Sequence, residues 1–272
     1  MAKTSPYMAF SRSGGLLEGL ADQLSPQRCL LCGGHATSGV CEIAGPALCG
    51  DCHADLPVVT NPCRHCAMPA VGGKDVCSDC ITDPLFEFCV AAFEYAYPVD
   101  RLVQAFKFSN NYAAGRALAE PLAQALLAHY QFAEAKSDCE PDAFVSMSTP
   151  DVIVPVPLHW WRRLRRSFNQ AEEIADIVCD RFPSDLSPQL LTKGARRILW
   201  TRAQSSLPLK ERRRNLERAF SLDEAVAAAV NGKTVLLIDD VLTTGSTLLA
   251  LAKRLKALHA KAIHVAVLAR TV

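Results

Sequence analysis

The stretch VLLIDDVLTTGST, from Val235 to Thr247, carries most of the structural information in this sequence. A short apolar run leads into two adjacent aspartates, Asp239 and Asp240, and a turn rich in Thr, Gly and Ser follows. The apolar run predicts a buried strand, and the turn opens a segment with helical spacing. Because charges inside a fully buried strand are costly, we expect the two carboxylates where the strand leaves the sheet.

The turn after the aspartates has the features of a phosphate-binding helix start. Backbone N–H groups at such a start, together with the positive end of the helix dipole, favour an anion. Glycine lets the backbone approach closely, and hydroxyl groups add donors. The stretch predicts a sugar-phosphate site with ribose hydroxyls on Asp239 and Asp240 and the 5-phosphate on Thr243, Thr244, Gly245, Ser246 and Thr247. The alternative is a plain helix N-cap with two solvated aspartates.

Strand-like and helix-like segments alternate on both sides of this stretch. Alternation of this kind predicts an α/β fold with a mostly parallel sheet flanked by helices and with ligands at the carboxyl ends of the strands. Pro121 must kink or divide the helix that contains it. The expected strands are 88–96, 152–156, 189–194, 234–238 and 262–269, and the expected helices are 98–108, 112–130, 168–182 and 246–260.

The overall composition excludes several classes of protein. The chain has 272 residues, of which half are hydrophobic, so it can form a substantial core, and its formal net charge is only +1. No uninterrupted apolar segment is long enough for a transmembrane helix, so we expect no membrane insertion. Residues 1–27 lack the apolar core of a secretory signal and predict a flexible end or a short helix near 16–24. A cytoplasmic location is the expectation.

Eight of the twelve cysteines fall into four C-x-x-C pairs between residues 29 and 80. Two such pairs complete a tetrahedral sulfur shell for zinc, and closed shells of this kind are structural. The segment has too few apolar residues to fold unaided, so metal binding would supply the missing free energy. The predicted ligands are Cys29, Cys32, Cys49 and Cys52 for one zinc ion and Cys63, Cys66, Cys77 and Cys80 for a second.

Alternatives remain open for the cysteines. The pairs can also combine in a cross-braced order, with Cys41, His35, His53 and His65 as substitute ligands, and redox chemistry or buried free thiols would need no metal. The separate cysteines, Cys89, Cys139 and Cys179, are interpreted as small buried hydrophobic residues. The composition changes near Pro84, which predicts a zinc-binding part at 28–84 and a second domain at 85–272.

Two basic blocks, 162–166 and 210–218, favour an anionic ligand. The first follows a predicted strand, where its cations suit the phosphate groups of a ligand. The polar stretch 195–218 is a candidate flap, with Gln204, Arg213 and Asn215 as its contacts, and Lys107 is a further candidate cation. The alternatives are solvated helix faces, or a groove for single-stranded nucleic acid with Trp160, Trp161 and Phe168 as stacking platforms.

The stretch VLLIDDVLTTGST resembles the phosphoribosyl-diphosphate (PRPP) motif of type I phosphoribosyltransferases. The chain from about residue 28 to its end resembles the ComF family of competence-associated, phosphoribosyltransferase-like proteins with an N-terminal double zinc ribbon. The other matching blocks are FKFSNNYAAGRALA (106–119), VPVPLHWWRRLRRSFNQAEEIA (154–175) and RAQSSLPLKERRRNLERAF (202–220). The resemblance implies ligand contacts for Arg166, Asn169 and Gln170, although Ser167 stands where the family carries glycine.

Two hypotheses of function follow from the resemblance. In the first, the protein is a phosphoribosyltransferase that binds PRPP with Mg²⁺ and serves DNA uptake or nucleotide metabolism. In the second, it is a non-catalytic accessory protein that senses PRPP or holds single-stranded DNA, with DNA-uptake or recombination proteins as partners. The zinc ribbon favours the second class slightly, because such ribbons usually grip macromolecules.

Overall fold

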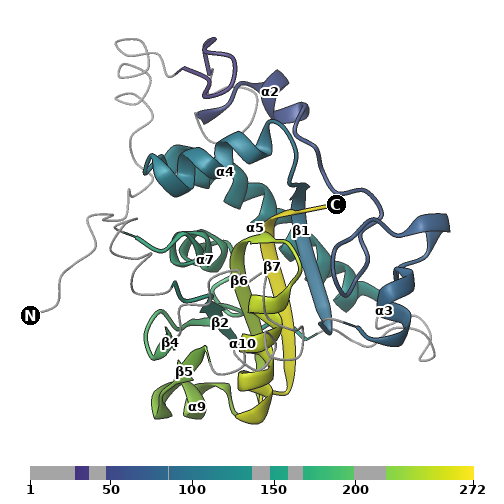
Figure 1. Cartoon of the computed structure of the whole chain (residues 1–272), viewed down its shortest axis with the longest axis vertical. Coiled ribbons are helices and arrows are strands. Elements are labelled where there is room, and N and C mark those ends of the chain that lie inside the picture. The colour runs from purple at the N-terminus through teal and green to yellow at the C-terminus, as the bar shows by residue number, and fades with distance from the viewer. Residues whose placement is uncertain (1–27, 37–46, 85, 137–147, 159–167, 199–218) are drawn as a thin grey trace, which may run out of the picture.

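The computed structural model describes residues 28–36, 47–84, 86–136, 148–158, 168–198 and 219–272 (Figure 1). In this part of the chain, a parallel sheet with helices on both faces follows a cysteine-rich segment with short helices, which confirms the predicted fold class. The strands of the sheet are β1 (Phe88–Glu94), β2 (Val152–Pro155), β3 (Gln189–Leu190), β6 (Thr234–Leu242) and β7 (Ala262–Arg270). The helices are α2 (Gly50–Ala54), η2 (Val71–Gly73), α3 (Ser78–Thr82), α4 (Val99–Phe108), α5 (Tyr112–Lys136), α7 (Gln170–Asp180), α9 (Glu224–Val230) and α10 (Ser246–Ala257).

The five strands lie in the order β1-β7-β6-β2-β3, and every neighbouring pair is parallel. The chain passes from β6 through α10 to β7 in one direction along the sheet, and from β2 through α7 to β3 in the other. The connections therefore diverge between β2 and β6. In open α/β sheets, ligands bind outside the carboxyl ends of the strands at such a point of divergence.

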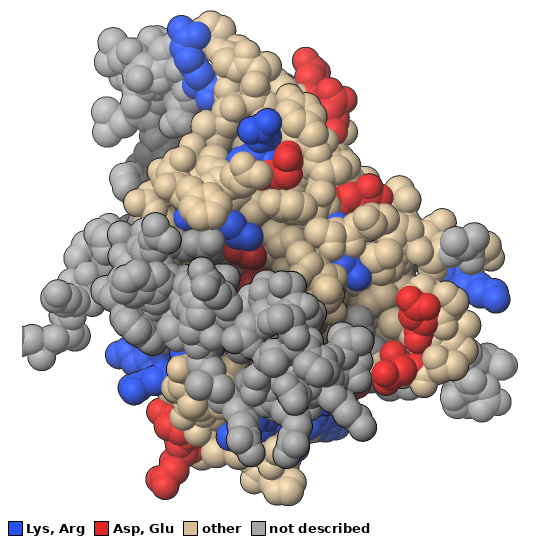
Figure 2. Space-filling view, viewed as in Figure 1, with Lys and Arg blue, Asp and Glu red and all other residues tan. Residues whose placement is uncertain are grey.

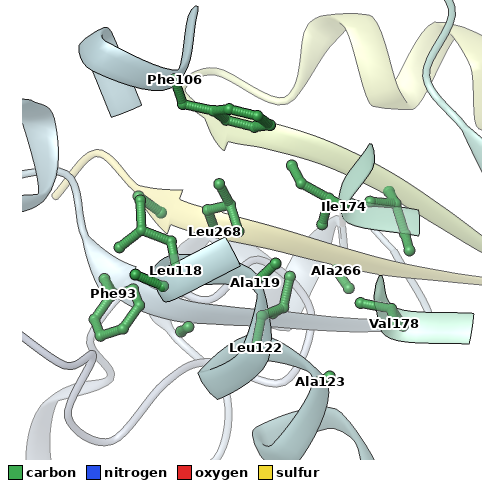
Figure 3. Packing of buried hydrophobic residues seen from close by; sticks show 14 of the residues in the cluster. Phe93, Phe106, Leu118, Ala119, Leu122, Ala123, Ile174, Val178, Ala266 and Leu268 are labelled. Atoms are coloured by element: carbon green, nitrogen blue, oxygen red, sulfur yellow. The ribbon is translucent and has the colours of Figure 1, made fainter. Parts of the chain in front are cut away.

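The two faces of the sheet bury alternate residues of each strand, as the period of a strand requires. Leu236 and Ile238 of β6 face the layer of α4, α5 and α7, whereas Val235 and Leu237 face α10 and α9. Figure 3 shows the first layer, with side chains from α4, α5 and α7 meeting those of the strands. In Figure 1, α10 lies over β6 and β7. The near-continuous apolar strands match this burial on both faces.

A separate two-stranded hairpin lies on the face of the main sheet that α9 and α10 cover. It consists of β4 (Ala195–Arg197) and β5 (Phe220–Leu222), which pair antiparallel. Phe220 is buried in the same core as α9 and α10. The hairpin leads directly into α9, where the side chain of Asp223 caps the helix by accepting from the N–H of Val226 at 3.1 Å.

Of the two outcomes predicted for Pro121, a kink or a division of the helix, the division does not occur, because α5 runs through the proline as one helix. Glu120 and Leu122 on either side of the proline are buried, so tertiary packing holds this part of the helix together. No described helix is both long enough and apolar enough to cross a membrane. The predicted helix near 16–24 lies outside the described residues.

Gly115→Ala is expected to destabilise the protein. A β-carbon at Gly115 of α5 would lie 2.5 Å from the ring of Phe106 in α4, and that ring is 1% exposed. The overpacking costs about 1–3 kcal/mol, which outweighs a gain of up to about 1 kcal/mol in helix propensity. Urea unfolding measures the change, and a variant as stable as the wild type would show that the ring shifts freely.

Candidate functional site

The stretch around Asp239 and Asp240 lies where β6 loses one of its two neighbours. Pairing with β2 ends at Ile238, whose carbonyl accepts from the N–H of Val156 at 2.8 Å. Pairing with β7 continues to Leu242. The aspartates therefore lie inside β6, and the expectation that the strand ends at them is wrong because pairing with β7 continues the strand for two residues beyond Asp240. Among the described residues, β6 has no strand partner on its β2 side beyond Ile238, and this is the point of divergence where open α/β sheets form their ligand crevice.

The two carboxylates have different partners. Lys107 of α4 forms an ion pair with Asp240, with Nζ 3.0 Å from Oδ1, so the predicted cation reaches the predicted acids. Asp239 Oδ1 accepts from the N–H of Asp240 at 2.9 Å. Burial, together with the negative charge of Asp240, raises the pKa of Asp239 to about 7, and the positive charges of Lys107 and Arg197 oppose this shift. The protein therefore holds two adjacent acids in a site that disfavours two negative charges.

The loop after β6 enters α10 through a left-handed residue. Gly245, with φ 73°, is the N-cap of α10, and only glycine adopts this conformation at little cost. Thr243 and Thr244 are exposed, whereas Ser246 and Thr247 are half-buried. The hydroxyl oxygens of Thr244 and Ser246 lie 2.6 Å apart. The loop, which we call the phosphate loop (residues 243–247), thus combines an exposed hydroxyl pair with the first N–H groups of a helix of 12 residues.

Asn169 and Gln170 lie at the start of α7 and are both buried. The side chain of Asn169 caps this helix by accepting from the N–H of Ala171 at 3.2 Å. Its amide also donates to the carbonyl of Val156 at 3.2 Å, which ties the helix start to the end of β2. Asn169 therefore fixes the start of α7 next to the point where β2 leaves β6. Direct ligand contact by Asn169 and Gln170 stays a prediction.

The remaining predicted contacts, Arg166, Gln204, Arg213 and Asn215, lie outside the described residues. Sequence reasoning missed Arg197 of β4, whose positive charge acts on Asp239. The guanidinium carbon of Arg197 lies 5.8 Å from the centroid of the Phe220 ring across the hairpin. In the sequence, Arg197 is only one of several arginines in the basic stretch 195–218, and no pattern distinguishes it from its neighbours.

The eight paired cysteines form two groups in the described part of the chain. Within each group, the sulfur atoms all lie within 4.8 Å of one another, and consecutive C-x-x-C pairs combine rather than alternate ones. His35, His53 and His65 belong to neither group, and Cys41 lies outside the described residues. The first group is Cys29, Cys32, Cys49 and Cys52, and the second is Cys63, Cys66, Cys77 and Cys80.

Local structure explains how each group forms. The first pair of each group lies on a tight turn, since the N–H of Gly33 donates to the carbonyl of Cys29 and the N–H of Ala67 to that of Cys63. The second pair lies at a helix start, because Cys49 and Cys77 are the N-caps of α2 and α3. Each group therefore combines a turn with a helix N-terminus, both of which direct N–H groups at the thiols.

The geometry of both groups fits zinc. A tetrahedral shell with Zn–S bonds of about 2.3 Å has sulfur atoms about 3.8 Å apart. The observed separations are 3.8 Å between the sulfurs of Cys32 and Cys49 and 3.6 Å between those of Cys66 and Cys77. Burial raises the pKa of Cys29, but hydrogen bonds from the backbone at Cys32 and Cys49 lower it overall to about 6, whereas burial and hydrogen bonds with the neighbouring thiols raise the pKa of Cys52 in the same group. A thiolate is the form that binds zinc.

Of the other cysteines, Cys89 is buried in the core of the sheet, as predicted. Cys179 is only half-buried, and its thiol lies 3.5 Å from the carbonyl of Pro188. Cys139 lies outside the described residues.

Comparison with known proteins gives two family matches. Residues 188–271 match the phosphoribosyl transferase domain, a range that contains β6, the phosphate loop and β7. Residues 20–81 match the double zinc ribbon domain, a range that contains both cysteine groups. The two matches coincide with the two sites that the structure forms.

Three curated relatives extend over most of the chain. Competence protein F of Haemophilus influenzae is 32% identical over 247 residues, which is 89% of this chain and 96% of the relative. The DNA utilization protein YhgH of Escherichia coli K12 is 30% identical over 225 residues, which is 82% of this chain and 90% of the relative. The YhgH protein of Salmonella typhimurium is 29% identical over the same number of residues.

Proposed function

Because the chain belongs to the ComF family, which includes Competence protein F and the DNA utilization protein YhgH, we propose that it binds PRPP or another ribose phosphate together with Mg²⁺. The observation that carries this proposal is the crevice beside β6, where Asp239, Asp240 and Lys107 meet the phosphate loop. Carboxylates, a cation and a helix start at one place match the hydroxyls and the phosphate of a sugar phosphate.

Each part of the crevice has its own role in this proposal. Asp239 and Asp240 accept hydrogen bonds from the ribose hydroxyls. The N–H groups and hydroxyls of the phosphate loop donate to the 5-phosphate. Lys107 is paired with Asp240, and the phosphate groups of PRPP compete for its ammonium group. Binding therefore exchanges a protein ion pair for charge-assisted hydrogen bonds to the ligand.

If the protein is a transferase, diphosphate leaves the anomeric carbon of PRPP and a nucleophile bonds to that carbon in its place. Mg²⁺ would supply charge neutralisation for the leaving diphosphate, and carboxylates such as Asp239 and Asp240 are the hard oxygen ligands that suit it. The chain's own contribution is to hold the ribose and its 5-phosphate still while the bond breaks. Arg166, Gln204, Arg213 and Asn215 are the proposed contacts of the diphosphate.

Titration calorimetry tests the binding step. With zinc-loaded protein and Mg²⁺, we expect PRPP and ribose 5-phosphate to bind and ribose itself to bind at least about tenfold more weakly, since charge-assisted hydrogen bonds to the phosphate are lost. Release of diphosphate across a panel of bases and nucleosides then tests transfer. Flat titrations with every ribose phosphate would overturn the proposal.

The second candidate is an accessory protein in DNA uptake that holds single-stranded DNA without catalysis. It is favoured by the double zinc ribbon and by the competence and DNA utilization named in the relatives. On the face of the molecule that Figure 2 presents, the basic side chains of the described residues are scattered among acidic ones rather than gathered in a continuous band. Fluorescence anisotropy with an oligothymidylate measures binding of single-stranded DNA. Tight binding, without release of diphosphate in the presence of any acceptor, would support this candidate over the transferase.

A further inference from the structure

Arg270, the last residue of β7, contacts two distant parts of the molecule with one buried side chain. Its exposure is 8%. Nε donates to the carbonyl of Cys66 at 3.0 Å. Nη1 donates to the carbonyl of Leu242 at 2.8 Å and also contacts the carbonyl oxygen of Thr243. Cys66 belongs to the second cysteine group and Thr243 is the first residue of the phosphate loop, so one guanidinium group joins the two sites.

The contacts at the loop end are reinforced by the next residue. Nη1 of Arg270 also lies 2.8 Å from the carbonyl oxygen of Thr271 and 3.1 Å from its hydroxyl oxygen. The N–H of Thr271 donates to the carbonyl of Leu242 at 3.1 Å. Because the guanidinium group is planar and rigid, its two ends hold the two sets of carbonyl groups at a fixed separation. A shift at one end is therefore transmitted to the other or breaks the hydrogen bonds.

The other end of this link depends on the second metal site. The turn that carries Cys66 is closed by a hydrogen bond from the N–H of Cys63 to the carbonyl of Met68 at 2.7 Å. It is attached to the sheet through the N–H of Cys89, which donates to the carbonyl of Arg64 at 2.8 Å. The local core contains three of the four cysteines and Ala70, with Met68, Val76 and Cys77 packed against it, and Ala67 of the same turn is buried in the core of the sheet. The local core is small, so the place of the Cys66 carbonyl depends on the ion as well as on these contacts.

The first cysteine group is attached elsewhere. Cys29 is buried in the core beneath α4 and α5, and Cys49 and Cys52 pack against the same core. In Figure 1, α2 lies near α4, whereas α3 lies on the far side of β1 from the rest of the sheet. The two metal sites thus contact different parts of the second domain, and only the second contributes a carbonyl group to Arg270.

We propose that Arg270 is a positioning residue that makes the order of the phosphate loop depend on the metal ion in the second cysteine group and not on the ion in the first. The ligand affinity that follows from this order rests on the proposed function. The order of the loop does not rest on it, because the link from Cys66 to Thr243 consists of hydrogen bonds within the chain. The coupling is reciprocal, so a ligand on the loop also raises the affinity of the second group for its metal ion.

Hydrogen exchange measured by mass spectrometry tests the link without any ligand. In the full chain loaded with zinc, Cys77→Ser removes a ligand of the second group and Cys29→Ser removes one of the first. We expect amide exchange in peptides covering residues 240–252 to accelerate about tenfold or more in Cys77→Ser, where local opening becomes easier, and to stay unchanged in Cys29→Ser. Equal acceleration in both variants, or none in either, would overturn the proposal.

Arg270→Lys tests the residue itself. Lysine keeps the positive charge but lacks the rigid fork, so it satisfies one end of the link at a time. We expect this variant to retain both zinc ions and to show the fast exchange of residues 240–252 that Cys77→Ser shows. Arg181→Lys, which alters an ion pair with Glu120 away from the loop, is the matched control and should leave this exchange unchanged. Wild-type exchange in Arg270→Lys would contradict the assignment.

Equilibrium competition for zinc with a colorimetric chelator measures the reciprocal effect. Ribose 5-phosphate should raise the affinity for one of the two zinc ions of the wild type several-fold, and Cys29→Ser should retain this effect. The effect should vanish in Arg270→Lys. If ribose 5-phosphate does not bind the wild type, the proposed function fails, and the exchange experiments still decide the role of Arg270.

Discussion

Asp239→Asn combined with Asp240→Asn is expected to weaken PRPP binding by about a hundredfold or more. A hydrogen bond to a charged group contributes about 1.5–3 kcal/mol, and the double variant removes the charge from two acceptors. Asparagine also presents an NH₂ group to the ribose hydroxyls, which leaves fewer acceptors in the crevice. Calorimetry with Mg²⁺ measures the affinity, and diphosphate release measures any turnover.

The same double variant should keep its fold. Asp185→Asn, at an exposed position, is the matched control and should bind PRPP as the wild type does. Loss of affinity in both variants would point to a general effect of charge rather than to the crevice. Undiminished affinity in the double variant would remove the two carboxylates from the site and, with them, the main support for the proposed function.

The single variant Asp239→Asn should also change how stability depends on pH. The folded protein raises the pKa of Asp239 from 3.8 to about 7, so folding takes up a proton between these values. The stability that this group contributes is therefore fully present below about pH 4 and is lost as the pH rises through 7. Above pH 7, Asp239→Asn should be more stable than the wild type by about 1–2 kcal/mol in urea unfolding, and the difference should shrink as the pH falls.

Removal of zinc is the other change with a large expected effect. Protein purified without chelator should contain about two zinc ions per chain, one for each cysteine group. Structural zinc sites contribute about 10 kcal/mol or more, so a strong chelator should unfold the segment that contains both groups. Zinc analysis and limited proteolysis of residues 28–84 measure the result.

Variants of the cysteines separate the two sites. Cys63→Ser combined with Cys66→Ser should reduce the content to about one zinc ion per chain, because consecutive pairs form each group. Cys179→Ser, which changes a cysteine outside both groups, should leave two. A protein that lacks zinc from the outset and still resists proteolysis over 28–84 would contradict the prediction.

Much of the fold could be predicted because its signals are local. The apolar run before Asp239 and the glycine-bearing turn after Asp240 are contiguous in the chain, so their order alone indicates a strand, a loop and a helix start. The C-x-x-C pairs are equally local signals, because a spacing of two residues allows both cysteines of a pair to bind the same metal ion. Pro121 shows the limit of local signals: its preference to divide a helix is real, but the buried surface of α5 outweighs it.

By itself, then, the sequence determined the α/β class, the four C-x-x-C pairs and the order of strand, acids, loop and helix around Asp239, since each is a pattern of neighbouring residues. Only the tertiary structure decided which C-x-x-C pairs combine, that β2 leaves β6 at Ile238 and opens the crevice, and that Lys107 reaches Asp240. It also decided that Arg270 joins Cys66 to the phosphate loop. The physical reason is that these contacts join residues far apart in the chain, and packing brings them together without leaving a periodic signal in the sequence.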